Sequence, residues 1–299
     1  MTTFAVTGAT GHLGGLVIEK LLASGVPASE IAPVVRTHHK GAPFAAQGMD
    51  VRVGTYDDPI GLTAALHGVE KIVLISPPTL DNAQRLHQLY QAVLAIRATG
   101  VSQLLYVSLA APEQRAFNLE DVDVAIEHSI RAMDLPFTFM RNSVYLDELV
   151  PELRAAAVSG QLVSTTEDQP LNWVARAHLA EAITAGLRDQ KHLGQTYELT
   201  APELFTYSDL AELLSGITGR QITHRRVSRD DAIEALDRAG MDREHATGMI
   251  DGFHSAIAAR KFTDTSTAIA DLTGRSAGLT AEVLQDLVGR EAPFAPRHQ

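Results

Sequence analysis

The feature that most constrains the fold is a glycine-rich turn close to the N-terminus. Residues 3–7 form TFAVT, a short run of apolar and β-branched side chains, and residues 8–14 form GATGHLG. The helical pattern LVIEKLLASG follows at 16–25. A strand, a glycine turn and a helix start in this order build a binding site for the phosphates of a dinucleotide.

Each glycine of the turn has a separate expected role. Gly8 allows the chain to turn sharply, Gly11 allows the backbone to approach a pyrophosphate, and Gly14 lets the helix lie close to the sheet. The spacing is Gly-x-x-Gly-x-x-Gly, so a purely structural turn is the alternative; the position between a strand and a helix favours the cofactor. The predicted cofactor-binding residues of the turn are Gly8, Thr10, Gly11, His12, Leu13 and Gly14.

Strand and helix patterns alternate through the first half of the chain, which indicates βαβ units and a parallel sheet. Continuous apolar runs such as KIVLIS are typical of strands covered on both faces. We therefore predict an α/β fold with a Rossmann-type doubly wound parallel sheet. The strands are expected near 3–7, 31–35, 49–54, 71–76, 103–108, 137–142 and 195–200.

The later half has mainly helical patterns, which predicts a second, smaller and mainly helical domain towards the C-terminus. The dinucleotide-binding domain is expected at 1–145, with a return segment at about 171–200. The smaller, substrate-side domain is expected at 146–170 and 201–299. Within it, the pattern at 206–219 predicts a helix with Ser208 as its cap.

Composition excludes several classes of function. The 299 residues include no cysteine, which excludes disulfides, thiolate catalysis and zinc–thiolate sites. A formal net charge of −11 disfavours nucleic acid and anionic membranes as partners. The twelve histidines form no His-Glu-x-x-His motif, and the pair His38-His39 is expected in a solvated loop, so no metal site is predicted.

The remaining indications concern location and assembly. The N-terminus has no basic segment typical of a signal peptide, and no apolar run reaches membrane-spanning length. We therefore expect a cytoplasmic protein with a small-molecule partner. The oligomeric state stays open, and the sequence admits a homo-oligomer.

The end of the second predicted strand indicates the cofactor type. An acidic residue at this point binds the ribose 2′-hydroxyl in NAD-preferring folds. Here the strand ends at Arg36, with Lys40 nearby and no Asp or Glu. A guanidinium suits a 2′-phosphate, so we predict NADP, with NADPH preferred over NADH. A surface arginine without a role is the alternative.

Several segments in order resemble one family. They are GATGHLG, VVR, LISPP, YVSLAA, FMRNSVY and YELT, followed by the helical tail. Together they resemble the NmrA-like family, an atypical short-chain dehydrogenase/reductase group, and in particular its bacterial NADPH-dependent quinone oxidoreductase branch. The resemblance extends over nearly the whole chain. It implies hydride transfer from NADPH to a quinone or similar electron acceptor.

The resemblance also implies roles for single residues. Thr55 and Tyr56 would lie by the adenine, and Ser108 near the nicotinamide. Ile75, Ser76 and Pro77 would pass beside the cofactor ribose and diphosphate. Asn142, Tyr145 and His128 are the candidate catalytic or pocket-lining residues.

The chain departs from the family pattern at several positions. His128 stands where members usually carry a Lys after a Glu, Thr55 where an Asp is common, and His178 where another Asp is frequent. No Tyr-x-x-x-Lys is present. Tyr145 and His128 are candidate proton donors, and each is equally compatible with a pocket wall. Cofactor binding is therefore better supported than turnover.

Two other functions compete with the reductase. The first is a non-catalytic NADP-binding redox sensor or regulator of the NmrA type, which the missing Lys would suit. The second is sugar-nucleotide epimerisation, which is disfavoured because that chemistry normally uses the missing Tyr and Lys. Hydride transfer to a quinone needs mainly two flat rings held face to face.

Overall fold

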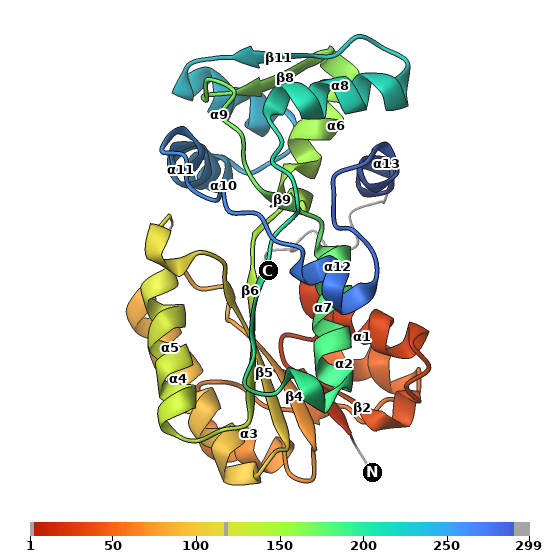
Figure 1. Cartoon of the computed structure of the whole chain (residues 1–299), viewed down its shortest axis with the longest axis vertical. Helices are drawn as coiled ribbons and strands as arrows, with labels where there is room; N and C mark the ends of the chain where they lie inside the picture. The colour runs from red at the N-terminus through yellow and green to blue at the C-terminus, as the bar shows by residue number, and fades with distance from the viewer. Residues whose placement is uncertain (1–2, 117–118, 290–299) are drawn as a thin grey trace. The chain divides into compact units, whose positions relative to one another are not determined.

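A seven-stranded parallel sheet organises the first part of the chain (Figure 1). The computed structural model describes residues 3–116 and 119–289. The strand order is β10-β6-β5-β4-β1-β2-β3, and each pair in it is parallel. The strands are β1 (Phe4–Val6), β2 (Ile31–Val35), β3 (Arg52–Val53), β4 (Lys71–Ile75), β5 (Gln103–Leu109), β6 (Phe137–Asn142) and β10 (Thr196–Leu199). This order confirms the predicted doubly wound Rossmann-type sheet.

Helices cover both faces of this sheet, as Figure 1 shows with α4 and α5 on one side and α1 and α7 on the other. The helices are α1 (His12–Ala23), α2 (His38–Ala45), α3 (Pro59–Ala65), α4 (Asn82–Thr99), α5 (Glu120–Ala132), α7 (Arg176–Arg188) and α12 (Ala268–Thr273). Short 3-10 turns occupy Ala28–Glu30, Pro112–Gln114 and Gln190–His192. Because both faces are covered, β1, β2 and nearly all of β5 are buried along their length.

Local chemistry fixes the ends of α4, the longest of these helices. The Asp81 carboxylate accepts hydrogen bonds from the backbone N–H groups of Ala83 and Gln84. Gly100 ends the helix in the left-handed conformation, with φ +67°. The helix then buries Leu89, Val93 and Ile96 against the sheet.

The chain divides into two compact units. The first contains residues 1–142, 176–199 and 268–274, and the second contains 143–175, 200–267 and 275–299. Residues 143–145 and 171–175, expected with the dinucleotide-binding domain, lie in the second unit. Residues 268–274, expected in the smaller domain, lie in the first, because α12 packs against α7 and β10.

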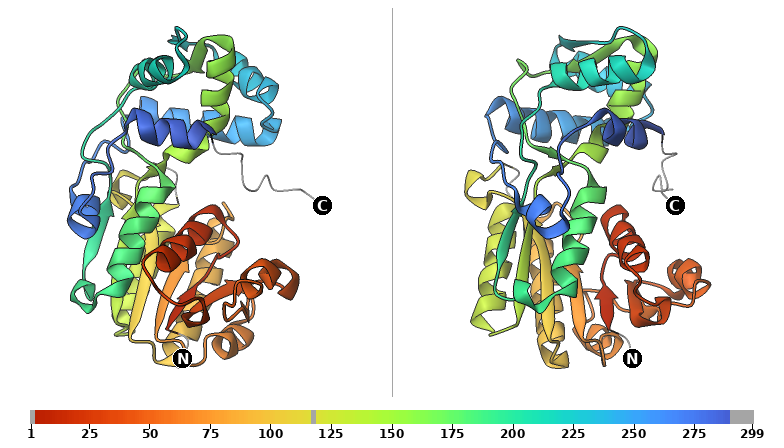
Figure 2. Two further views of the ribbon diagram at one scale, coloured as in Figure 1. Left: turned by 90° about the vertical axis from the view of Figure 1, so that its right-hand side faces the viewer. Right: turned by 45° about the vertical axis from the view of Figure 1, so that its right-hand side comes forward.

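The second unit is mainly helical, as predicted. Its helices are α6 (Val150–Ser159), α8 (Tyr207–Thr218), α9 (Arg229–Arg238), α10 (Arg243–Gly248), α11 (Ser255–Ala258) and α13 (Ala281–Gly289), with a 3-10 turn at Leu146–Leu149 and a π-helical turn at Met249–His254. Two small parallel sheets pair β8 (Gln161–Ser164) with β11 (Thr223–Arg226) and β7 (Val144–Tyr145) with β9 (Trp173–Val174). Figure 2 shows the same elements in two further views.

Two sequence predictions need correction. The cap of α8 is Thr206 and not Ser208: Thr206 and Asp209 form a reciprocal capping box. His38 and His39 do not lie in a loop but begin α2.

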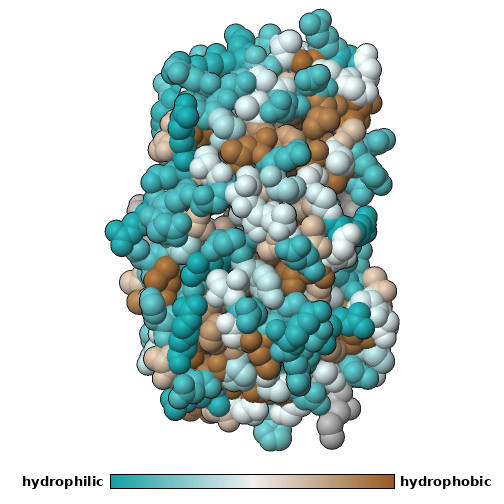
Figure 3. All heavy atoms as spheres, viewed as in Figure 1, coloured by the Kyte–Doolittle hydropathy of each residue, from teal (hydrophilic) through white to brown (hydrophobic). Residues whose placement is uncertain are grey.

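None of the helices in the described ranges is long and apolar enough to cross a membrane. On the face drawn in Figure 3, hydrophobic residues form separate patches among hydrophilic ones.

Candidate functional site: a dinucleotide-binding turn and its surroundings

The glycine turn after β1 has the geometry that phosphate binding needs. Gly8 has φ +61°, a left-handed conformation that favours glycine. A Cβ added to Gly14 would lie 2.8 Å from the Gly8 carbonyl carbon and 3.1 Å from Ala9 Cα. The Gly11 N–H donates to the Gly8 carbonyl oxygen at 2.9 Å, which closes the turn. The backbone of Gly8 and Ala9 therefore lies closer to the first turn of α1 than a side chain at position 14 would allow.

Four residues of the turn are open to solvent. Gly8, Thr10, Gly11 and His12 are exposed, whereas the Leu13 side chain is buried. Gly11 caps α1 without a side-chain hydrogen bond, and no acidic residue lies in the first turn. No carboxylate of α1 itself therefore neutralises the positive end of the helix dipole. This leaves the dipole available to a bound anion.

The carboxyl ends of β1 and β4 are joined by a hydroxyl network. Thr7 Oγ1 donates to the Val73 carbonyl oxygen at 3.1 Å and accepts from the Ile75 N–H at 2.9 Å. The Tyr56 hydroxyl lies 2.7 Å from both Thr7 Oγ1 and the Ile75 carbonyl oxygen. Burial raises the pKa of Tyr56 well above its usual range, so it stays a neutral donor. This network fixes the point where the strand order reverses, which is where such folds bind dinucleotides.

Arg36 follows β2 as an exposed side chain. Within the described part of the chain, its guanidinium has no ion-pair or hydrogen-bond partner. Arg52 on the neighbouring strand, by contrast, pairs with Asp50 at 2.7 Å. Thr55 is half-buried and donates to the Asp57 carboxylate at 3.3 Å. An unpaired exposed cation next to the phosphate turn is therefore available for an anionic ligand.

Ser76 and Pro77 leave β4 over a buried charged cluster. The Pro77 carbonyl oxygen accepts from Arg85 Nη1 at 2.9 Å, and Arg85 Nη2 lies 3.4 Å from Asp123 Oδ1. The Tyr106 hydroxyl donates to the same Asp123 oxygen at 2.5 Å. Burial raises the pKa of Asp123 and, together with this carboxylate, raises that of Tyr106. Through the hydrogen bond from Arg85 to Pro77, the cluster fixes the segment that follows β4.

Ser108 near the end of β5 contacts a second charged cluster. Its hydroxyl donates to Glu127 Oε1 at 2.8 Å. Arg141 donates to both oxygens of Glu127, from Nε at 2.9 Å and from Nη2 at 2.7 Å, and its Nη1 donates to Glu198 at 2.9 Å. These hydrogen bonds raise the pKa of Arg141. The cluster joins α5, β6 and β10 to the carboxyl end of β5.

Helix α5 turns three of its four acids inward, which sequence analysis missed. Glu120, Asp123 and Glu127 are at most 2% exposed, whereas His128 is exposed. Their spacing of three and four residues places them on one helix face, beside the buried Ile126 and Ile130. The signal was available in the sequence as acids in phase with the apolar stripe. Of the neighbouring pair, Glu127 therefore contacts the sheet through Ser108 and Arg141, whereas the predicted His128 is exposed on the same helix.

The two remaining candidate residues lie in different units. Asn142 ends β6 in the first unit and is fully buried, and its carbonyl oxygen accepts from the Ala110 N–H at 2.9 Å. Tyr145 is half-buried in β7 of the second unit. The cofactor-binding candidates all belong to the first unit and lie at or after the ends of β1 to β5.

The second unit has its own buried polar network, which sequence analysis did not predict. Ser164 Oγ lies 2.8 Å from His224 Nε2, and His224 Nδ1 lies 3.3 Å from Asp168 Oδ1. The Tyr207 hydroxyl lies 3.0 Å from His254 Nε2. Burial lowers the pKa of His224 below its usual value. Since Ser164 is fully buried, this arrangement supports the packing of the unit and offers no accessible nucleophile.

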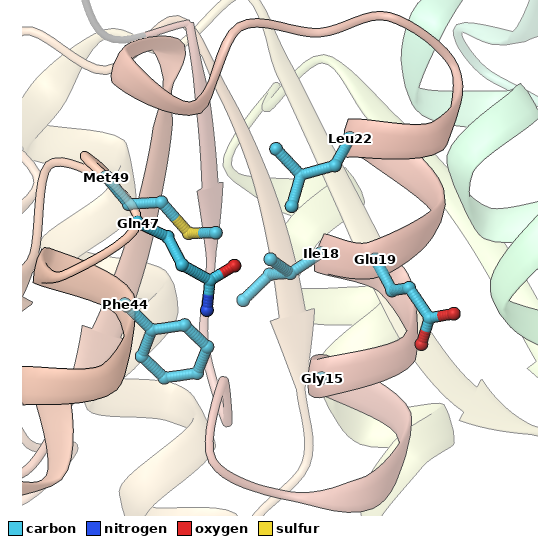
Figure 4. A pocket seen from close by; sticks show the side chains of 7 residues that line it. All are labelled: Gly15, Ile18, Glu19, Leu22, Phe44, Gln47 and Met49. Carbon is cyan, nitrogen blue, oxygen red and sulfur yellow. The ribbon is translucent and has the colours of Figure 1, made fainter.

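A pocket of about 240 Å³ runs along the side of α1 (Figure 4). Its walls are one stripe of α1 and the segment at and after the end of α2, with Phe44 and Met49 facing Ile18. Binding pockets for small molecules usually measure about 300–1,000 Å³. This pocket has the features of a gap between two surface helices. Among the described residues, no group of His, Asp and Glu side chains could hold a metal ion.

Comparisons with known proteins find a family and relatives that match nearly the whole chain. The sequence model of the NmrA-like family matches residues 1–270. Quinone oxidoreductase 2 of Escherichia coli (strain K12) is 32% identical over 283 residues, covering 95% of this chain and 98% of the relative.

Two solved structures share nearly the whole fold. Triphenylmethane reductase of Citrobacter sp., complexed with NADP(H), has a TM-score of 0.89 at 35% identity, covering 95% of this chain and 99% of that one. The NADPH-dependent quinone oxidoreductase of Escherichia coli, complexed with NADPH, has a TM-score of 0.84 at 32% identity, with the same coverage.

Proposed function

The chain belongs to the NmrA-like family, and from this premise we propose that it is an NADPH-dependent reductase that transfers hydride to a quinone or similar flat electron acceptor. The observation that carries the proposal is the likeness, over nearly the full length of both chains, to an NADPH-dependent quinone oxidoreductase. The phosphate turn and the unpaired Arg36 are the features of this chain that such a cofactor needs.

The residues present fit NADPH. The turn from Gly8 to Gly14 would hold the diphosphate through backbone N–H groups, and Arg36 would bind the 2′-phosphate. Ile75, Ser76 and Pro77 would line the ribose and diphosphate, and Ser108 would lie near the nicotinamide. For the adenine, Thr55 and the ring of Tyr56 are the proposed contacts; the Tyr56 hydroxyl is already engaged with Thr7.

When bound, NADPH supplies the hydride. The protein has to hold two flat rings at reacting distance and exclude water, which is where most of the rate gain of such a reaction arises. A quinone is already electrophilic, so its reduction needs no strong acid–base pair. The absence of a Tyr-x-x-x-Lys motif from the sequence is compatible with this chemistry.

The acceptor side of the proposal rests on Asn142, Tyr145 and His128. Asn142 and Tyr145 are proposed to line the acceptor pocket, and Tyr145 carries the hydroxyl that could protonate the reduced acceptor. His128 is exposed on α5, so a role in proton transfer requires the acceptor to reach that helix face. The non-catalytic redox sensor is not favoured, because the similar proteins are reductases.

Two further points belong to the proposal. We place the protein in the cytoplasm, since a chain without cysteine suits a reducing compartment. A homo-oligomer is compatible with the chain, and the proposed chemistry does not depend on it.

A steady-state assay tests the proposed function. Purified protein is mixed with NADPH and a panel of quinones, triphenylmethane dyes and azo dyes, and cofactor oxidation is followed by absorbance. We expect turnover with at least one quinone and a much lower rate with NADH. Tight NADPH binding without turnover on any acceptor would support the sensor and overturn the reductase.

A further inference from the structure

The Ser108 hydroxyl has a fixed direction. Both oxygens of Glu127 accept hydrogen bonds from Arg141, at 2.9 Å and 2.7 Å. The contact of 2.8 Å between Ser108 Oγ and Glu127 Oε1 therefore uses the hydroxyl proton, with Ser108 as donor. Ser108 thus has no proton left to donate to a ligand, and its remaining lone pairs can only accept.

The charged partners make this direction hard to change. Glu127 is 2% exposed and Arg141 lies between Glu127 and Glu198, so neither side chain is free to turn away. Arg131 Nη1 adds a positive charge at 3.7 Å from Glu127 Oε2. Breaking a buried, hydrogen-bonded charge pair is costly, and the cluster therefore keeps Glu127 as an acceptor for Ser108.

The sheet topology places Ser108 on one side of the phosphate turn. In the sheet, β2 and β3 lie on one side of β1, and β4, β5, β6 and β10 lie on the other side. Arg36 at the end of β2 is proposed to bind the 2′-phosphate, so the adenosine half of NADPH would lie on the side of β2 and β3. The nicotinamide half then extends over the ends of β4 and β5, where Ser108 pairs with Arg141 in register.

We propose that Ser108 accepts a hydrogen bond from the carboxamide NH₂ group of the nicotinamide, and that Glu127 is the positioning residue that makes Ser108 an acceptor. This inference rests on the proposed use of NADPH. The carboxamide is the part of the nicotinamide that carries N–H donors, so it matches a hydroxyl that can only accept. Ser108 consequently orients the ring and is not the proton donor for the reduced acceptor.

A cofactor analogue tests this role directly. In the 3-acetylpyridine analogue of NADP⁺, a methyl group replaces the NH₂ group and the carbonyl stays. Calorimetric titration gives the dissociation constants of NADP⁺ and of the analogue for the unmodified protein, without any need for turnover. We expect NADP⁺ to bind about tenfold more tightly, the usual effect of leaving one hydrogen-bonding group without its partner.

Three variants separate positioning from general structure. Ser108→Ala removes the acceptor and should bring the ratio of the two dissociation constants close to one. Glu127→Gln allows its amide to donate to Ser108, which frees the hydroxyl proton for a carbonyl and should also reduce the ratio. Glu198→Gln neutralises the other carboxylate partner of Arg141 without touching the Ser108–Glu127 contact, so the ratio should stay at its unmodified value.

The outcomes are distinct. A ratio near one in the unmodified protein, or an unchanged ratio in Ser108→Ala, overturns the inference while leaving the reductase intact. Equal effects of Glu127→Gln and Glu198→Gln mean that the cluster acts only as structural support and also overturn it. If NADP⁺ and NADPH do not bind at all, both the inference and the proposed function fail.

Discussion

Replacing Gly14 with alanine tests the phosphate turn most sharply. The new Cβ would lie 2.8 Å from the Gly8 carbonyl carbon and 3.1 Å from Ala9 Cα, while ordinary contact begins at 3.4 Å. The Gly8 carbonyl oxygen is closer still, and all three neighbours are backbone atoms, so relieving the clash requires the turn to move by more than about 0.6 Å. The first helical turn and the loop that should hold the diphosphate would therefore separate.

The size of the effect follows from these contacts. Crowding of this kind costs about 1–3 kcal/mol of folding free energy, and alanine in a helix returns about 0.5–1 kcal/mol relative to glycine. Net destabilisation should therefore stay within about 2.5 kcal/mol, so the protein still folds. A displaced backbone N–H loses a charge-assisted hydrogen bond to phosphate, worth about 1.5–3 kcal/mol, or roughly tenfold to a hundredfold in NADPH affinity.

The adjacent Gly15 supplies a matched control. It lies in the same helix, and its added Cβ would meet only the Ala9 carbonyl oxygen, at 3.8 Å. Gly15→Ala should stabilise the protein slightly and leave NADPH binding unchanged. NADPH fluorescence titration gives the affinities, and urea unfolding gives the stabilities. Equal NADPH affinity in Gly14→Ala and the unmodified protein would refute the assignment of the turn.

Three further predictions follow from single residues. Arg36→Ala should weaken NADPH binding about tenfold or more and leave NADH binding unchanged, measured by titration with both cofactors; equal losses would remove the 2′-phosphate role. Tyr56→Phe should cost about 1 kcal/mol in urea unfolding, because Thr7 and the Ile75 carbonyl oxygen lose their donor; an unchanged unfolding midpoint would contradict this network. Burial lowers the pKa of His224 below its usual 6.5, so the stability it contributes is complete above that pH and is lost as pH falls below it. The melting temperature of His224→Gln should consequently fall less between about pH 7.5 and pH 5.5 than that of the unmodified protein; parallel losses would assign the pH dependence to other groups.

The parts of the fold that sequence could predict are those where local chemistry and tertiary burial agree. The run at 31–35 became β2 without a change of bounds, because a continuous apolar run suits a strand covered on both faces. The segment at 137–142 also became β6 with the bounds expected. At 49–54, by contrast, only Arg52–Val53 pair as a strand, because β3 is the edge of the sheet with a single neighbour. The cap predicted at Ser208 lies at Thr206, because the reciprocal contact of Thr206 with Asp209 appears only in the folded chain.

The candidate site likewise contains residues that could be found from the sequence and residues that could not. The glycine turn and the exposed Arg36 could be located from the sequence, because the roles proposed for them depend on backbone conformation and on a charge beside a strand end. The roles of Glu127 and Asp123 could not, because a buried acid is recognised by its partners, and Arg141, Tyr106 and Arg85 come from other elements.

The central claim is that this chain reduces an acceptor with NADPH, and a single-turnover experiment tests it most directly. Protein loaded with one equivalent of NADPH is mixed without oxygen with a quinone that the steady-state panel selects. We expect bound NADPH to disappear in step with hydroquinone formation. Both should be slower when deuterium replaces the hydrogen that NADPH transfers. Tightly bound NADPH that persists in the presence of every acceptor would contradict it.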